Sequence, residues 1–153
     1  MKYREIAGEK ISVLGFGCMR FPTTSKNVED IDAEKSAKML EYAIENGVNY
    51  FDTAYVYHGG KSESFIGGVL KPYRDKIHIA TKCPTWEVKC EEDFDRLLNE
   101  QLERLQTDYI DFYIMHALDK DRFKNVVEKF NLIDKLNKAK ADGKIRHIGF
   151  SFH

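Results

Sequence analysis

A chain of 153 residues, 42% hydrophobic and 12% aromatic, is long enough for one domain with a sizeable core, and this composition argues against intrinsic disorder. The 24 basic and 25 acidic residues leave a net charge of −1, which argues against nucleic-acid binding through bulk electrostatics. No apolar run approaches the roughly 18 residues of a membrane span, and the N-terminus lacks the apolar stretch of a signal peptide. We therefore expect a single cytoplasmic domain over residues 1–153, with no membrane or nucleic-acid partner.

The cysteines Cys18, Cys83 and Cys90 are odd in number and form no CxxC pair. This pattern indicates neither a disulfide framework nor a zinc site. Free thiols in a reducing cytoplasm are the simplest interpretation, and no metal site is predicted.

Apolar and amphipathic segments alternate regularly along the chain. Residues 3–6 and 11–13 flank a Gly8-Glu9 turn and predict a short hairpin. Further strands are expected at residues 14–18, 48–52, 77–82, 109–116 and 147–152. Helices are expected at residues 33–46, 62–70, 94–105 and 123–136, and residues 27–32 are expected to form a loop.

The last expected helix carries a stripe of apolar residues at helical spacing and is followed by a stop at Gly143. Its apolar residues are Phe123, Val126, Val127, Phe130, Ile133 and Leu136. We expect this stripe, including Val126, Phe130 and Ile133, to face the core.

The element order is a hairpin, then four strand–helix units, then a fifth strand. Strands that alternate with helices predict an α/β fold with a parallel sheet and right-handed crossovers.

Chemically active side chains stand where the expected strands end. The second strand ends in Asp52, the third in Lys82 and the fourth in His116, while the fifth carries Ser151. In parallel α/β folds, ligands bind at the carboxyl ends of the strands. These residues should therefore surround one cavity mouth, with Tyr57 in the loop after Asp52.

Each of these residues also has a purely structural interpretation. Asp52 could cap the next loop, Lys82 could be a solvated strand end, and His116 could be a satisfied core histidine. Their shared position at three consecutive strand ends is what favours a functional site.

Five segments together resemble the aldo-keto reductase family. They are GFGCMR at 15–20, FDTAYVY and GKSE at 51–57 and 60–63, IATK at 79–82, DYIDFYIMH at 108–116 and GKIRHIGFS at 143–151. The segments occur in the family order and cover the whole chain, and the opening one is similar to a bacterial branch.

The resemblance implies a (β/α)8 barrel that reduces the carbonyl group of a small molecule with NADPH. Tyr57 would then be the general acid, and Lys82 would favour its phenolate form because a nearby cation stabilises a negative charge. Asp52 would hold Lys82, and His116 would orient the substrate carbonyl.

The resemblance also implies a cofactor cleft in this part of the chain. Ser151 would contact the nicotinamide carboxamide, and the backbone near Gly17, Cys18 and Met19, with Asp52, would line the cleft. NADH remains an alternative to NADPH.

Two departures from the family pattern stand out. Phe152 follows the strand-five serine where many members have Asn, and an eight-stranded barrel takes about 250 residues. The expected fold is thus an incomplete barrel, either the N-terminal part of a longer reductase or a half-barrel that self-associates through its open sheet edges.

Three other functions remain open. Lys82 could form a Schiff base in a barrel lyase. Asp52 and His116, with His153, could bind a metal in a hydrolase. The chain could also be a non-catalytic subunit that senses a cofactor.

Overall fold

An N-terminal hairpin precedes the main sheet. In the computed structural model, which describes residues 1–152, β1 (Tyr3–Ile6) and β2 (Glu9–Ser12) pair antiparallel. The two turn residues, Ala7 and Gly8, both have positive φ, as a tight hairpin turn requires. The expected hairpin is confirmed, with its second strand beginning and ending slightly earlier than predicted.

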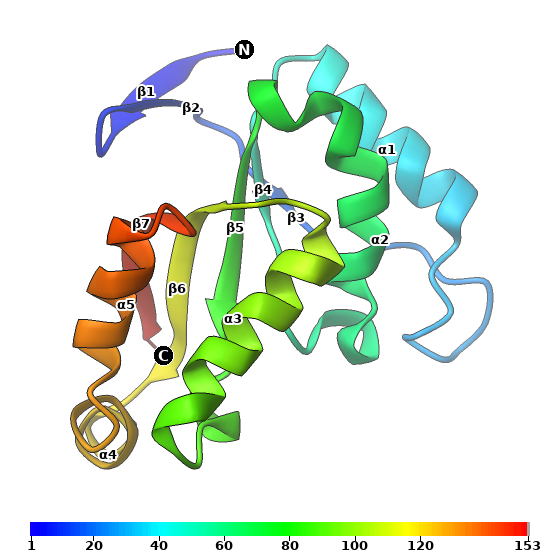
Figure 1. Cartoon of the computed structure of the whole chain (residues 1–153). Helices are drawn as coiled ribbons and strands as arrows, with labels where there is room; N and C mark the ends of the chain where they lie inside the picture. Colours follow the sequence, from blue (N-terminus) through cyan, green and yellow to red (C-terminus); the bar gives the residue numbers. More distant parts are fainter. Residues whose placement is uncertain (153) are drawn as a thin grey trace.

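Within the described residues 1–152, five parallel strands form the main sheet in simple sequence order (Figure 1). They are β3 (Phe16–Gly17), β4 (Tyr50–Asp52), β5 (His78–Cys83), β6 (Ile110–Leu118) and β7 (Ile145–Phe152). The predicted α/β class and the parallel sheet are confirmed. The first strand is shorter than expected because the chain bends at Leu14, which is exposed.

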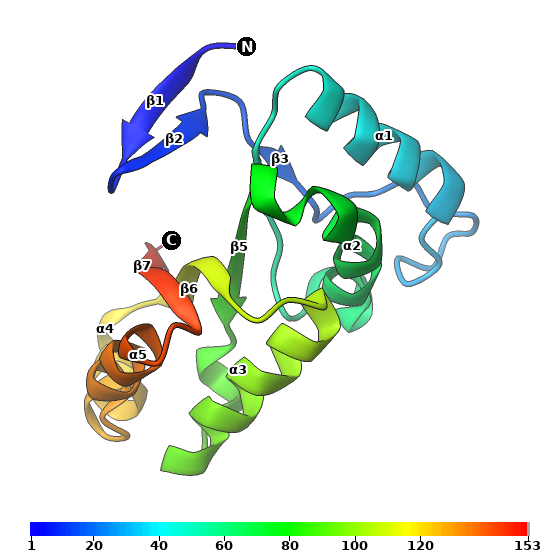
Figure 2. The same cartoon turned by 45° about the horizontal axis from the view of Figure 1, so that its top comes forward.

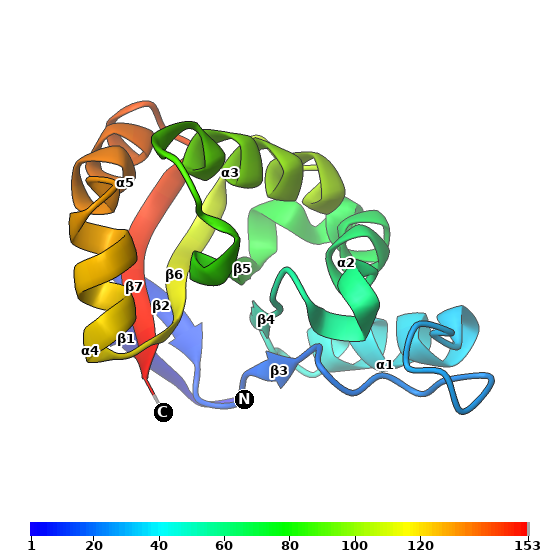
Figure 3. The same cartoon turned by 90° about the horizontal axis from the view of Figure 1, so that it is seen from below.

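Helices cover the outer side of the curved sheet, as the view from below shows (Figure 3). They are α1 (Ala33–Glu45), α2 (Ser62–Leu70), α3 (Glu91–Leu105), α4 (Lys120–Arg122) and α5 (Leu132–Ala141). Short helical turns are η1 (Tyr57–Gly60), η2 (Lys71–Lys76), η3 (Thr85–Glu87) and the π-helical η4 (Phe123–Glu128). The core lies between this helical layer and the strands, with Phe51, Phe94 and Tyr113 among its largest fully buried side chains.

The helix expected over residues 123–136 is wrong as a single element. Asn131 has a φ of 51°, in the left-handed region, and separates the η4 turn from α5. The apolar stripe therefore does not continue along one axis. Phe123 and Ile133 are exposed rather than core-facing, whereas Val127 and Leu136 are buried.

The hairpin lies at the amino-terminal ends of the parallel strands (Figures 1 and 2). Asn49 anchors it there, because the Ser12 N–H donates to Asn49 Oδ1 at 2.7 Å and the Asn49 N–H donates to Ser12 Oγ at 3.1 Å. The opposite, carboxyl ends of the strands are left open for a site.

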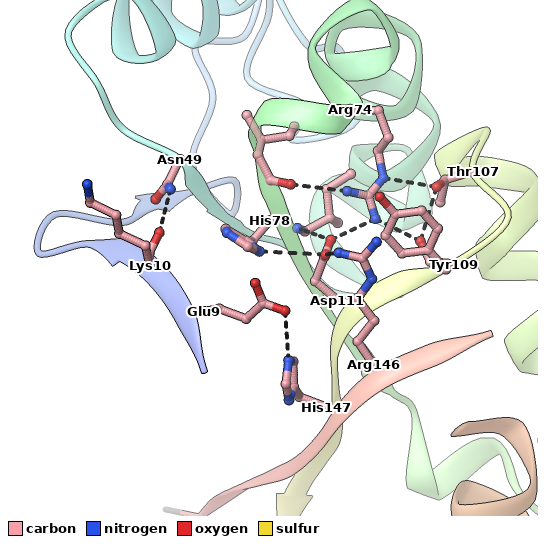
Figure 4. Close-up of polar contacts among 12 residues, drawn as sticks. Glu9, Lys10, Asn49, Arg74, His78, Thr107, Tyr109, Asp111, Arg146 and His147 are labelled. Atoms are coloured by element: carbon pink, nitrogen blue, oxygen red, sulfur yellow. Dashed lines mark hydrogen bonds and ion pairs between the residues drawn. The ribbon is translucent and has the colours of Figure 1, made fainter. Parts of the chain in front are cut away.

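A buried carboxylate ties β5, β6 and β7 together at these amino-terminal ends (Figure 4). Asp111, which is fully buried, accepts from the Ile79 N–H at 2.9 Å and pairs with Arg74 at 2.6 Å and Arg146 at 3.1 Å. Two arginines thus offset the cost of burying this charge. Close by, His147 lies 3.2 Å from Glu9 of the hairpin.

The strands β3 and β7 form the two edges of the sheet, so within residues 1–152 each is paired on one side only. Among the same residues, no helix is both long and apolar enough to cross a membrane.

Candidate active site

The carboxyl ends of β4 and β5 bring three of the predicted residues into direct contact. Lys82, on β5, donates from Nζ to Asp52 Oδ1 at 2.7 Å. The same ammonium group donates to the Tyr57 hydroxyl at 3.3 Å and to the backbone carbonyl of Thr53 at 2.7 Å. All three donor positions of the ammonium group are therefore in use.

Lys82 is an almost fully buried cation, with a side chain only 8% exposed. A charge in such a place is stable only when it is paired and hydrogen-bonded. Asp52, whose side chain is 32% exposed, supplies the counter-charge from the end of β4. The pair orients the ammonium group toward Tyr57.

Tyr57 and His116 face each other across the same opening. Tyr57 begins the η1 turn after β4, and its ring meets that of His116 edge-on at a centroid distance of 6.4 Å. Trp86, from η3, also packs against His116, with a distance of 5.1 Å between the ring centroids. The structure thus brings Asp52, Tyr57, Lys82 and His116 together, as the sequence predicts.

A pocket of about 440 Å³ opens beside Tyr57 and His116. Its remaining wall is mainly apolar and comes from the loops after β3 and β4. The other lining residues are Met19, Val28, Val56, His58 and Gly59. A small organic molecule with a polar atom directed at Tyr57 would fit a site of this kind.

The predicted cofactor residues Gly17 and Ser151 lie near the carboxyl ends of β3 and β7, the first and last strands of the sheet. Gly17 ends β3, and a Cβ atom added there would meet nothing within 4 Å, so a ligand has space to approach the backbone. On β7, Ser151 Oγ accepts from the Ala117 N–H at 2.8 Å and keeps its own hydrogen to donate. Met19 is exposed.

Cys18 is buried rather than open to the cleft, and its N–H donates to the carbonyl of Asp52 at 2.8 Å. Burial raises the pKa of the Cys18 thiol, and the nearby Asp52 carboxylate raises it further. The residue therefore contributes backbone rather than a reactive thiolate.

His58 is a site residue that the sequence pattern does not reveal. It is buried and has a φ of 54°. Its Nε2 accepts from the Phe21 N–H at 3.0 Å, so Nδ1 carries the hydrogen and donates to the Val28 carbonyl at 2.5 Å. His58 thus fixes the loop over the pocket, and only its long-range partners identify this role.

The geometry bears on the other functions considered. Lys82 is paired with Asp52, whereas a Schiff-base lysine needs a free amine. The same ammonium group is paired with Asp52 Oδ1, which would be one of the ligands of a metal bound at Asp52. Within residues 1–152 no group of three His, Cys, Asp or Glu side chains could hold a metal. His153 lies outside the described residues.

Comparison with known proteins places the chain in a family. The sequence model of the Aldo/keto reductase family matches residues 13–153, which is most of the chain. The chain belongs to the aldo/keto reductase family. A probable aldo-keto reductase 1 from Glycine max is 32% identical over 153 residues, covering 94% of this chain and 42% of that protein.

Solved structures of the family have the same arrangement of strands and helices. The holo form of an aldo-keto reductase from Bacillus halodurans superposes with a TM-score of 0.81 at 31% identity, covering 99% of this chain and 50% of that one. An aldo/keto reductase from Klebsiella pneumoniae, in complex with NADP and acetate, has a TM-score of 0.72 at 26% identity, with coverages of 92% and 46%.

The chain thus spans about half the length of the relatives that it matches. Their full-length fold is a (β/α)8 barrel, and the sheet described above is an incomplete version of it.

Proposed function

We propose that this chain carries the proton-donating centre of a carbonyl reductase that converts aldehydes or ketones to alcohols with NADPH. The observation that carries the proposal is the position of the Lys82 ammonium group. It lies between Asp52, at 2.7 Å, and the hydroxyl of Tyr57, at 3.3 Å. The ammonium group donates a hydrogen bond to the Tyr57 oxygen, where the negative charge would develop as the proton is transferred.

Each residue of the centre has one task in this reaction. NADPH, when bound, supplies a hydride to the carbonyl carbon. The Tyr57 hydroxyl donates its proton to the carbonyl oxygen, which becomes the alcohol. The resulting phenolate is stabilised by Lys82, and Asp52 keeps Lys82 in place. His116, whose ring contacts that of Tyr57, hydrogen-bonds the carbonyl oxygen and orients it.

The residues at the sheet edge fit the nicotinamide end of such a cofactor. Ser151 has a hydroxyl hydrogen to donate to a carboxamide, and the space above Gly17 allows close approach. The NADP complex of the Klebsiella pneumoniae relative supports the choice of cofactor. NADH is the alternative, and the experiment below compares the two.

Self-association is part of the proposal. The edges β3 and β7 can pair further, and an apolar groove of about 440 Å³ runs beside β7. Its lining includes Phe123, Ile133, Phe150 and Phe152, all of them exposed. We propose that a second copy covers this groove, and that the enzyme acts as an assembly.

The test is a steady-state assay of aldehyde reduction by the whole chain, with NADPH and with NADH. Replacing Tyr57 with Phe removes the proton donor, and we expect the turnover rate to fall by about 10²–10⁴-fold. Tyr55→Phe is the matched control, because its hydroxyl contacts Glu100 rather than Lys82. Equal turnover in wild type and Tyr57→Phe would refute the assignment, and a wild type that binds cofactor without turnover would favour a sensing subunit.

A further inference from the structure

A buried polar network holds the carboxyl end of β5 from the helical side of the sheet. Glu63 of α2 accepts at Oε1 from the Thr81 hydroxyl and from Gln101 Nε2, both at 2.6 Å. Gln101, on α3, accepts at Oε1 from the Tyr113 hydroxyl at 2.7 Å. All four side chains belong to fully buried residues.

Gln101 also reaches the backbone of the residue that carries the site's cation. Its Nε2 donates to the carbonyl oxygen of Lys82 at 3.1 Å. Carbonyls of alternate residues point to the same edge of a strand, and two residues earlier the carbonyl of Ala80 accepts from the Thr53 N–H of the β4 side at 2.8 Å. Because β4 ends at Asp52, the sheet offers no further donor to this edge, and the Gln101 amide takes that place.

We propose that Gln101 is a positioning residue for Lys82, and that Glu63 fixes the amide of Gln101 for this purpose. Lys82 is then held at both ends. Gln101 holds its backbone, while Asp52 and the Thr53 carbonyl hold its ammonium group. The effect of Gln101 on catalysis rests on the proposed reductase function, whereas its effect on the position of Lys82 does not.

The composition of the network favours such a role over simple core filling. Apolar side chains would cost less desolvation free energy here, because Glu63 is a fully buried carboxyl group. Burial raises the pKa of Glu63, and the hydrogen bonds from Thr81 and Gln101 oppose this effect. Arg104 lies 3.4 Å from the second oxygen, Oε2, and so leaves Oε1 to the other two partners.

The test measures how firmly Lys82 is held, by competitive acetylation of the folded chain with mass-spectrometric readout. The exposed Lys38 is the internal reference. Replacing Gln101 with Leu removes the hydrogen bond to the Lys82 carbonyl. One net hydrogen bond corresponds to about a fivefold change in an opening equilibrium, so we expect the ratio of Lys82 to Lys38 acetylation to rise about fivefold.

A control separates positioning from general destabilisation. Asp111→Asn weakens the opposite end of the same strand, where Asp111 accepts from the Ile79 N–H. A structural effect alone predicts equal rises in Gln101→Leu and Asp111→Asn. Equal rises, or no rise in folded Gln101→Leu, would overturn the proposal.

Two further measurements guard against a variant that does not fold. Gln101→Asn keeps an amide but is too short to reach Lys82, and it should raise the ratio in the same way. In the wild type, the side-chain amide protons of Gln101 should exchange slowly with solvent in NMR spectra, and rapid exchange would overturn the proposal without any variant.

Kinetics then connects the network with the proposed reaction. If the wild type reduces aldehydes, Gln101→Leu should lower kcat more than it changes KM, because substrate does not contact the outer side of the sheet. If the wild type shows no reductase activity, the acetylation ratio still decides the positioning role. Failure of the proposed function and failure of this inference are therefore distinguishable.

Discussion

At the scale of single residues, the site depends on a charge that is buried at a cost. The charge of Lys82 is tolerated there because it is paired with Asp52. Loss of Asp52 and loss of Lys82 should therefore affect the stability of the fold differently. Removing Asp52 leaves a cation in the interior without its partner, whereas replacing Lys82 with Met leaves only a partly exposed carboxylate.

We therefore predict that Asp52→Ala lowers the free energy of unfolding by about 3 kcal/mol, and that Lys82→Met lowers it by clearly less. Denaturant unfolding at neutral pH measures both. In the double variant the cost of Asp52→Ala should largely disappear. Equal losses in the two single variants would contradict the proposed asymmetry.

The sequence predicts the residues of this centre but not their supports. Asp52, Lys82 and His116 follow apolar runs, so a parallel sheet must bring them to one edge. His58 and Gln101 have no such signal. Their partners come from a distant loop and from the far side of the sheet, and these contacts exist only in the folded chain.

At the scale of elements, helices α2 and α3 approach each other closely at one glycine. A Cβ atom on Gly67 would lie 2.4 Å from the Arg104 carbonyl oxygen and 2.7 Å from the Leu105 carbonyl carbon, and backbone cannot move aside easily. The adjacent Gly68 has only the flexible side chain of Gln106 nearby, at 3.8 Å.

These neighbouring glycines make a matched pair of variants. Gly67→Ala should lower the free energy of unfolding by about 1–3 kcal/mol, because overpacking forces the helices apart. Gly68→Ala should be neutral or should stabilise the helix by up to about 1 kcal/mol. Thermal melts of both variants provide the measurement, and equal effects would contradict the prediction that Gly67 is needed for the close packing of α2 and α3.

The stability of the hairpin should depend on acid pH through the contact between Glu9, next to its turn, and His147. The hydrogen bond from His147 is the largest cause that lowers the pKa of Glu9 below its ordinary 4.5, and His78 and Arg146 act in the same direction. A lowered pKa contributes stability above the unfolded value, and this contribution is lost as the pH falls through the folded value.

Below pH 4.5, the free energy of unfolding of the wild type should therefore fall more steeply than that of Glu9→Gln. Well below the pKa values of Glu9 in both the unfolded and the folded chain, the two slopes should be equal. Unfolding free energies measured across this range decide the matter. Glu5→Gln, at an exposed position on the same hairpin, is the control and should follow the wild type. Parallel curves for Glu9→Gln and wild type would contradict the role of the contact.

Element order and type follow from the sequence because the strand and helix periods alternate clearly. The break between η4 and α5 at Asn131 does not follow from the sequence. An apolar stripe at helical spacing runs through it, and asparagine is acceptable both inside a helix and in the left-handed conformation that ends one. Only the packing of the two segments decides between these options.

At the scale of the whole molecule, the groove beside β7 defines the expected assembly. Phe150 and Phe152 are 67% and 72% exposed, and such a patch next to an unpaired edge strand favours association. Sedimentation should give a mass of at least twice 17.8 kDa. Phe150→Ser should shift it toward the monomer, and Ile6→Ser on the exposed hairpin should not. A strictly monomeric chain with protected β7 amides would contradict self-association.

We propose that Tyr57, held by Lys82 and Asp52, protonates a carbonyl oxygen while hydride reaches the carbon. The most direct measurement uses NADPH that carries deuterium at the transferable position, with an aldehyde and the whole chain. We predict one deuterium on the carbon of each alcohol molecule formed, at similar rates for wild type and Tyr55→Phe, and about 10²–10⁴-fold more slowly for Tyr57→Phe. Alcohol without deuterium, or equal rates for wild type and Tyr57→Phe, would contradict this role of Tyr57.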